Sequence, residues 1–346
     1  MNRSVPFFNY QKFFTDTEAE LTPILTDVCR RGAFILQKDL AEFEETAAKF
    51  VGAKYVIGMA NATDALHFAV RGAGIGPGDE VIFCSHTMVA SPASVHFAGA
   101  TPVPVECGPD HLIDPAAVEA AITSKTVAIM PTQLNGRTAN MDALQAIADK
   151  HGLVIIEDSA QAFGSKFKGK CAGTFGIAGC ISFYPAKTLG CFGDGGCLIT
   201  SDDALYEQVM LLRDHGRDHT GEVVMWGLNS RLDNLQAAIL NFKMKTYEQD
   251  IARRRRGRSP ASYVTSNFAT SPHRHCPTSP DAILILPTSS KTNESKSIIA
   301  ANHKHTCEAK HSVARPMEWK NHSQQLEHGC VGQFTEECSK RCISVP

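Results

Sequence analysis

The sequence predicts an α/β fold in which a mostly parallel sheet carries helices on both faces. Short apolar runs alternate with helical patterns over about 200 residues, an order typical of parallel strands joined by helices. Residues 153–156 form a continuous apolar and mostly β-branched run, as expected for a strand buried on both faces. With 346 residues, the chain is long enough for one large domain and a smaller part.

The first expected elements are two helices. Thr15 to Glu18 has the spacing of a capping box, and apolar residues then recur at helical intervals up to Gly32. A second helix is expected from about Asp39 to Gly52, since glycine often follows a helix end. The later elements are expected, in chain order, as a strand at 55–59, a helix opening at 60–66, a strand at 80–84, a helix at 90–99, a strand at 102–105, a helix from Pro115, a strand at 126–130, a helix at 141–151, the strand at 153–156, a strand from Gly179, and helices at 202–214 and 231–250.

The character of the chain changes after the arginine run at 253–256. Residues 257–346 are rich in Ser, Thr, Pro and His, and leucine occurs there only at 284, 286 and 326. Such a segment buries little apolar surface to offset its ordering entropy, so disorder is one expectation for it. We therefore predict a large domain at 1–256 and an atypical tail of low hydrophobicity at 257–346, with one strand at 282–286.

Composition excludes several classes of protein. The net charge of −2 gives no general attraction to nucleic acid or anionic membranes, and no apolar stretch is long enough to span a bilayer. The first residues lack the apolar core of a signal peptide, so we expect a cytoplasmic protein whose 12 cysteines are mostly reduced. The alternative of a zinc site formed by His328, Cys330, Cys338 and Cys342 is disfavoured, because their spacing fits no compact finger. The sequence therefore predicts no metal site, no nucleic-acid partner and no membrane partner.

Two residues suggest the chemistry. Lys187 stands in a turn among small residues after an apolar strand, and Asp158 follows the buried strand at 153–156. The carboxyl ends of strands in open α/β sheets face the ligand crevice. A lysine that forms a Schiff base and a carboxylate opposite a protonated ring nitrogen is the arrangement that holds pyridoxal phosphate. The alternatives are a surface lysine and an aspartate that caps the next helix.

A phosphate site is suggested by the strand at 55–59 and the helix after it. Ala62 and Thr63 stand at the start of this helix, where free backbone N–H groups and the helix dipole favour an anion. The alternative is that Asn61 or Thr63 only caps the helix, which is the commoner role of these residue types.

Several motifs, in the family's order, resemble the DegT/DnrJ/EryC1/StrS aminotransferases. The resemblance covers roughly residues 6–255. The motifs that carry it are Asn61-Ala62-Thr63-Asp64-Ala65-Leu66, Gly76-Pro77-Gly78-Asp79-Glu80-Val81, Glu157-Asp158-Ser159-Ala160-Gln161, Ser182-Phe183-Tyr184-Pro185-Ala186-Lys187 with Gly193-Asp194-Gly195-Gly196, and Asn229-Ser230-Arg231-Leu232. The resemblance implies a pyridoxal-phosphate-dependent transferase of fold type I. Because residues after about Gly257 do not resemble the family, its C-terminal small domain is expected to be replaced or atypical.

The resemblance also implies roles for single residues. Lys187 would bind pyridoxal 5′-phosphate covalently and move the proton, and Asp158 would keep the ring nitrogen protonated. Gln161 would lie beside the phenolic oxygen of the ring. In the family an aromatic residue usually stacks on the ring, and here Met88 stands at that position.

The resemblance also implies which residues bind the phosphate and which residue contacts a second subunit. Backbone groups of Ala62 and Thr63, with the Ser182 hydroxyl, would hold the phosphate. Asn229 would reach the cofactor of the neighbouring subunit, which implies a homodimer. Relatives that dehydrate their sugar have histidine at the position of Lys187, so the lysine favours transamination.

The resemblance predicts transamination of a nucleotide-linked keto-sugar, with glutamate as the amino donor. The first alternative is a catalytically impaired cofactor-binding remnant, because family members continue into a C-terminal domain that closes over the sugar and residues 257–346 do not resemble it. A shifted reading frame near Arg256 or an unrelated replacement tail would explain the change. The second alternative is a nucleotide-binding enzyme without pyridoxal phosphate, but residues 193–196 lack the GxGxxG spacing and the chain has no P-loop.

Overall fold

The computed structural model of the chain describes residues 8–256. These residues fall within the large domain predicted at 1–256. The atypical tail at 257–346, its expected strand and the His328 and Cys330 group lie outside the described residues.

The centre of the described part is a seven-stranded sheet with the order β1-β9-β8-β5-β4-β2-β3. Neighbouring strands from β8 to β3 are parallel, whereas β9 runs antiparallel to both β1 and β8. The predicted α/β class with a mostly parallel sheet is therefore confirmed. The strands are β1 (Tyr55–Met59), β2 (Glu80–Cys84), β3 (Thr101–Val105), β4 (Thr126–Met130), β5 (Val154–Asp158), β8 (Ala178–Ser182) and β9 (Gly196–Thr200).

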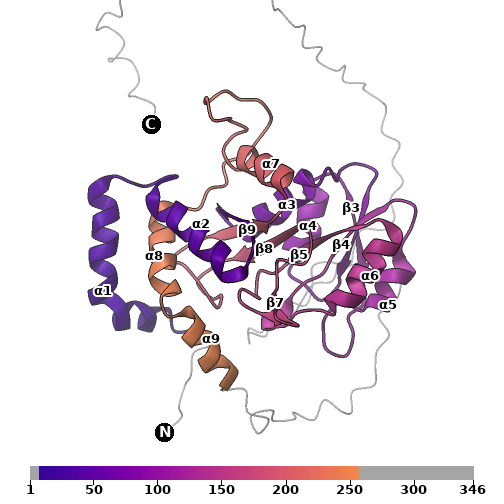
Figure 1. Ribbon diagram of the computed structural model, residues 1–346, viewed down its shortest axis with the longest axis horizontal. Helices are drawn as coiled ribbons and strands as arrows, with labels where there is room; N and C mark the ends of the chain where they lie inside the picture. The colour runs from indigo at the N-terminus through magenta and orange to yellow at the C-terminus, as the bar shows by residue number, and fades with distance from the viewer. Residues whose placement is uncertain (1–7, 257–346) are drawn as a thin grey trace, which may run out of the picture. The chain divides into compact units, whose positions relative to one another are not determined.

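Helices cover both faces of this sheet (Figure 1). On one face α3, α4 and α7 pack on the strands, and on the other lie α2 and α8 towards β1 and α5 and α6 towards β3. The helices are α1 (Tyr10–Arg31), α2 (Lys38–Val51), α3 (Ala62–Gly72), α4 (Ala90–Phe97), α5 (Pro115–Ala121), α6 (Met141–His151), α7 (Asp203–Arg213), α8 (Asn234–Met244) and α9 (Tyr247–Arg256). A 3₁₀ turn, Leu134–Gly136, and a small hairpin, β6 (Lys166–Phe167) with β7 (Lys170–Cys171), complete the described elements.

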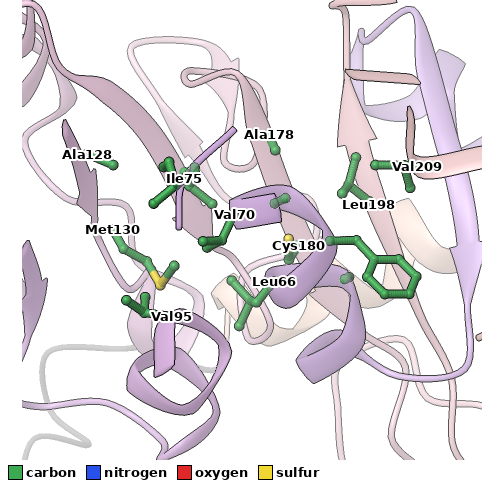
Figure 2. Close-up of a cluster of buried hydrophobic side chains, with 14 of the residues drawn as sticks. Leu66, Val70, Ile75, Val95, Ala128, Met130, Ala178, Cys180, Leu198 and Val209 are labelled. Atoms are coloured by element: carbon green, nitrogen blue, oxygen red, sulfur yellow. The ribbon is translucent and has the colours of Figure 1, made fainter. Parts of the chain in front are cut away.

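Successive residues of each central strand enter different cores, because side chains alternate along a strand. In β2, Val81 and Phe83 join the core under α3 and α4, while Ile82 and Cys84 join the core under α5 and α6. Figure 2 shows the first core, where Leu66 and Val70 of α3 lie over the sheet with Cys180 and Met130. Burial on both faces explains why these strands appear in the sequence as unbroken apolar runs.

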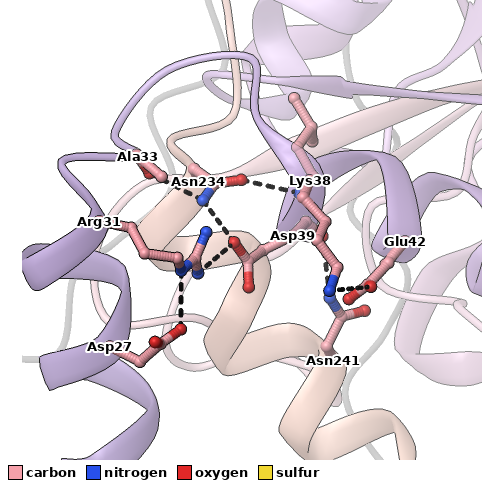
Figure 3. Close-up of polar contacts among 9 residues, drawn as sticks. Asp27, Arg31, Ala33, Lys38, Asp39, Glu42, Asn234 and Asn241 are labelled. Carbon is pink, nitrogen blue, oxygen red and sulfur yellow. Dashed lines mark hydrogen bonds and ion pairs between the residues drawn. The ribbon is translucent and has the colours of Figure 1, made fainter.

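A buried asparagine joins the N-terminal helices to α8 (Figure 3). Asn234 is fully buried; its Oδ1 accepts a hydrogen bond from the Leu40 amide at 2.9 Å, and its Nδ2 donates to Ala33 O at 2.8 Å. The same Nδ2 donates to Asp39 at 2.7 Å, and Arg31 pairs with that carboxylate at 2.9 Å. These contacts fix α1 and α2 against α8, and residues of α1 and α8 line a cavity that opens at Lys187.

The start of α1 was predicted wrongly. The helix begins at Tyr10, because Asn9 caps it by accepting a hydrogen bond from the Lys12 amide at 3.0 Å. Thr15 lies inside the helix, where its hydroxyl donates to Lys12 O instead of capping. Both predicted glycine ends are confirmed, since Gly32 and Gly52 follow α1 and α2 in the left-handed conformation.

The expected helix at 231–250 is two helices, α8 and α9. They meet at residues 245–246, and the second begins at Tyr247, whose side chain is only 2% exposed. The Tyr247 hydroxyl donates to Phe163 O at 2.9 Å, and its ring packs on Phe50 and Phe163. The prediction of one continuous helix was therefore wrong, because the chain turns between α8 and α9 and buries Tyr247.

Candidate active site

The predicted site residues follow two adjacent strands of the sheet. Asp158 is the last residue of β5, and Ser182 is the last residue of β8, with Lys187 in the turn beyond it. The Lys187 amide donates to Tyr184 O at 2.8 Å, which closes this turn. A Cβ atom at Gly190 would lie 2.5 Å from Pro185 O, so only glycine lets the chain fold back beside the lysine. The turn thus holds Lys187 near the carboxyl end of β5.

Asp158 is a buried carboxylate with an exposed fraction of 3%. The Ser91 hydroxyl donates to its Oδ2 at 2.5 Å, and the Ala160 amide lies 3.2 Å from its Oδ1. Burial raises the pKa of Asp158; the bond from Ser91 and the nearby charge of Lys187 oppose this shift. A buried carboxylate is most stable beside a cation, so this position favours a positively charged ring nitrogen.

A chain of hydroxyls supports this carboxylate. Ser91 shares a 2.7 Å hydrogen bond with Thr87, and the Thr132 hydroxyl donates to Thr87 at 2.8 Å. Sequence reasoning missed these three residues. Ser91 and Thr132 belong to α4 and to the loop after β4, and nothing in their local sequence indicates that they meet near Asp158.

Lys187 has the electrostatic properties of a reactive amine. Burial lowers its pKa, while the carboxylate of Asp158 opposes the shift, so the two side chains lie close enough to interact. A lowered pKa increases the fraction of neutral amine, which is the form that attacks a carbonyl carbon. The alternative of an ordinary surface lysine does not fit this half-buried position.

The start of α3 approaches the same edge of the sheet. Ser182 pairs in register with Gly196 of β9, and a Cβ atom at Gly196 would lie 2.6 Å from the Ala62 amide nitrogen. Glycine at 196 thus allows the helix to lie directly beside Ser182. Asn61 does cap the helix, since its Oδ1 accepts from the Asp64 amide at 2.8 Å, but the first-turn N–H groups of Ala62 and Thr63 have no acceptor within the helix.

Two adjoining cavities open at Lys187. One of about 780 Å³ extends between α1 and α8, and one of about 670 Å³ extends towards α9 and contains Gln161. The side-chain Oε1 of Gln161 accepts from the Asn135 amide at 3.0 Å. Tyr247 and Thr188 line both cavities and were not predicted; both belong to long-range contacts that local patterns do not reveal.

Two predicted residues do not meet Lys187 within the described part of the chain. Met88 is 59% exposed and precedes α4, and its sulfur accepts from the Ala90 amide at 3.1 Å. Asn229 is exposed and pairs through its backbone with Asp214. Among the predicted site residues, only Lys187 and Gln161 line the two cavities.

A family model described as the DegT/DnrJ/EryC1/StrS aminotransferase family matches residues 15–346. The chain belongs to this family. The predicted resemblance is thereby confirmed. The match covers more of the chain than the motifs recognised in the sequence, which ended near residue 255.

Relatives and solved structures agree with this membership. The UDP-2-acetamido-2-deoxy-3-oxo-D-glucuronate aminotransferase of Pseudomonas aeruginosa is 46% identical over 230 residues, which is 66% of this chain and 64% of the relative. The X-ray structure of S. venezuelae DesV matches with a TM-score of 0.69 and 42% identity, over 71% of this chain and 66% of that chain. Across the first relatives, this chain spans 64% to 68% of their length.

A further structure bears on the cofactor. NtdA from Bacillus subtilis, solved with bound cofactor PMP, matches with a TM-score of 0.67 and 32% identity, over 72% of this chain and 58% of that chain. Fold type I and membership of a family of aminotransferases that use pyridoxal 5′-phosphate, both predicted from the sequence, are confirmed. Among the described residues, no helix combines the length and the apolar character needed to cross a lipid bilayer.

Proposed function

We propose that this family member transfers an amino group from glutamate to the keto group of a nucleotide-linked sugar. The observation that carries the proposal is Lys187, a half-buried amine with a lowered pKa that lines a cavity and lies near the buried carboxylate of Asp158. This pair provides the amine and the negative charge that the cofactor requires.

The residues of the site fit pyridoxal phosphate. When bound, this cofactor supplies a carbonyl carbon that bonds to amines and a ring that accepts electrons. Asp158 would hold the proton on the ring nitrogen, and Gln161 would lie at the phenolic oxygen. The first-turn amides of Ala62 and Thr63 would bind the phosphate at the start of α3, with the Ser182 hydroxyl.

Lys187 would have two tasks. It would hold the cofactor covalently until the donor amine takes its place. The released Nζ would then be a free amine inside the cavity, where it would move the proton from the amino-bearing carbon of the donor to C4′ of the cofactor. Because its pKa is lowered by burial, Lys187 is free to accept a proton at a lower pH than an exposed lysine.

The substrate class rests on the relatives. The Pseudomonas relative is named for a UDP-linked oxo-sugar acid, and further relatives are named for dTDP-linked and GDP-linked amino sugars. These names support a nucleotide-linked keto-sugar as the acceptor here and do not favour the alternative of an impaired remnant.

The proposal is tested by following the absorbance of the purified chain loaded with pyridoxal phosphate. Glutamate alone should convert the lysine-bound form to the amine form, and a nucleotide-linked keto-sugar should then restore it, because the reaction consists of two half-reactions. Aspartate and lysine serve as comparison donors. A spectrum that glutamate leaves unchanged would exclude this donor, and a stable amine form with every keto-sugar tried would support the impaired remnant.

We further propose that the site is completed by a second copy of the chain. The loop between α7 and α8 exposes Trp226 by 88%, Val223 by 65% and Val224 by 55%, an apolar group more usual in interfaces than on a free surface. Asn229, in the same loop, would reach the cofactor in the partner's site.

Mixing two inactive variants tests this shared site. Lys187→Ala chains retain Asn229, and Asn229→Ala chains retain Lys187, so a mixed dimer contains one intact site. We expect co-expressed chains to show transaminase activity that neither variant shows alone. If the mixture is no more active than the sum of its parts, Asn229 does not act across an interface.

A further inference from the structure

Three potential metal ligands gather at a corner of the sheet outside the predicted site. His86 follows β2, while Cys107 and His111 follow β3, and one ligand atom from each lies within 4.8 Å of the others. The rings of His86 and His111 face each other edge to plane, with centroids 5.7 Å apart. Since β2 and β3 are parallel neighbours, their carboxyl ends bring the three residues together.

Backbone hydrogen bonds fix the chain on both sides of this group. The Ser85 amide donates to Val105 O at 2.9 Å, which places His86 beside the end of β3. Cys107 and His111 lie on a tight turn, in which the Gly108 amide donates to Leu112 O at 2.8 Å. His111 has a φ of 63°, a left-handed conformation that is unusual for a residue other than glycine. The backbone therefore holds the three side chains near one another without a ligand.

The donor atoms are open to a cation. Within residues 8–256, no side-chain hydrogen bond or ion pair engages the imidazoles of His86 or His111, and Cys107 is a free thiol. The carboxylates of Glu106 and Asp110 lie close enough to Cys107 to act on it electrostatically. The same negative charges attract a divalent cation.

We propose that His86, Cys107 and His111 bind Zn²⁺, with water as the fourth ligand. Two imidazoles and one thiolate match the borderline-soft character of zinc, and Ca²⁺ and Mg²⁺ require oxygen ligands instead. Zn–N bonds of about 2.0 Å and Zn–S bonds of about 2.3 Å in a tetrahedron place ligand atoms about 3.3–3.6 Å apart. The ligand atoms must therefore move closer by up to about 1.5 Å, which rotation of the exposed histidine side chains allows. On binding, the Cys107 thiol loses its proton to water and its sulfur bonds to the metal.

The proposed zinc ligands are not among the residues proposed to carry out transamination. Bound zinc would tie the loop after β2 to the turn after β3. The first of these loops also contains Thr87, which shares a hydrogen bond with Ser91, and the exposed Met88. Zinc would thus stiffen a loop next to the cofactor pocket without contributing to the reaction itself.

Equilibrium dialysis of the full chain, loaded with pyridoxal phosphate, against Zn²⁺ tests the proposal. Cys107→Ser and His86→Ala are compared with wild type and with a Cys29→Ser/His96→Ala control, since Cys29 and His96 are exposed and lie outside the group. Because loss of an outer contact alone typically costs about 10–100-fold in metal affinity, each ligand variant should lose about a hundredfold or more. The control should bind zinc like wild type.

Two additional readouts identify the ligands. Saturating zinc, at about a hundredfold excess over Kd, should raise the melting temperature of wild type by about 5–10 °C and leave that of Cys107→Ser unchanged. Co²⁺ in place of zinc should give a thiolate-to-metal band that disappears in Cys107→Ser. His86 is exposed, so its variant should fold even if the cysteine variant does not. Zinc binding by both ligand variants at wild-type affinity, or none by wild type, would overturn the proposal.

Discussion

Replacing Lys187 with alanine is expected to reduce transamination by about 10⁴-fold or more. The lysine has two tasks in the proposed reaction, covalent attachment and proton transfer, and alanine performs neither. Burial lowers the pKa of Lys187 and, to about 8, that of Lys243, which lines the same cavity, but Lys187 is the one whose charge interacts with Asp158. The rate of amino transfer from glutamate, measured in single-turnover experiments with saturating cofactor, gives this loss directly.

A charge-conserving variant separates the covalent role from an electrostatic one. Lys187→Arg keeps the positive charge near Asp158, but a guanidinium does not form the covalent bond and is not deprotonated in proteins. We therefore expect it to be as inactive as Lys187→Ala. Lys168→Ala, which changes an exposed lysine paired with Asp142, should retain the wild-type rate. An active Lys187→Arg enzyme would show that the lysine contributes only its charge.

The second large effect is expected for Asp158→Asn, with a loss of about 10²–10³-fold in the rate of amino transfer. Asparagine has nearly the same shape, but it is neutral and leaves the ring nitrogen without its negative partner. The ring would then accept electrons less well, while the proposed phosphate contacts at α3 would be unchanged. Cofactor binding should therefore weaken far less than the rate falls, which fluorescence titration and single-turnover kinetics measure separately.

A variant of the supporting hydroxyl distinguishes charge from packing at Asp158. Ser91→Ala removes the 2.5 Å hydrogen bond but retains the carboxylate, so it should reduce the rate much less than Asp158→Asn. Equal losses in both variants would mean that the rate depends on the hydrogen bond from Ser91 to Asp158 and not on the negative charge of Asp158. An Asp158→Asn enzyme with wild-type turnover would remove Asp158 from the proposed mechanism.

Much of the fold could be predicted because local signals were strong. Residues 80–84, 126–130 and 141–151 have the predicted bounds as β2, β4 and α6, since each is apolar at the period of its element or has a clear cap. The start of α1 and the break before Tyr247 could not be predicted, because an asparagine cap and a buried tyrosine compete with the local pattern. The antiparallel direction of β9 depends on pairing with β1 and β8 and has no local signal.

The candidate site, like the fold, could be predicted only in part from the sequence. Lys187 and Asp158 could be selected because one follows a strand and the other ends one, and the carboxyl ends of adjacent strands meet at one edge of a sheet. The hydroxyls of Ser91 and Thr132 belong to residues far along the chain from Asp158 and Thr87, so only the folded structure brings them together. The His86, Cys107 and His111 group was missed for a related reason, because its spacing matches no motif and depends on the register of β2 with β3.

The central claim, that Lys187 binds the cofactor covalently opposite Asp158, is tested most directly by reducing the cofactor-loaded chain with borohydride and sequencing the modified peptide. Reduction fixes the cofactor to the nitrogen that holds it, so the site is read from the peptide mass. We predict one modified lysine, Lys187, in wild type and in Asp158→Asn, and none in Lys187→Ala. Modification of another lysine, such as Lys243 in the adjoining part of the cavity, would contradict this account.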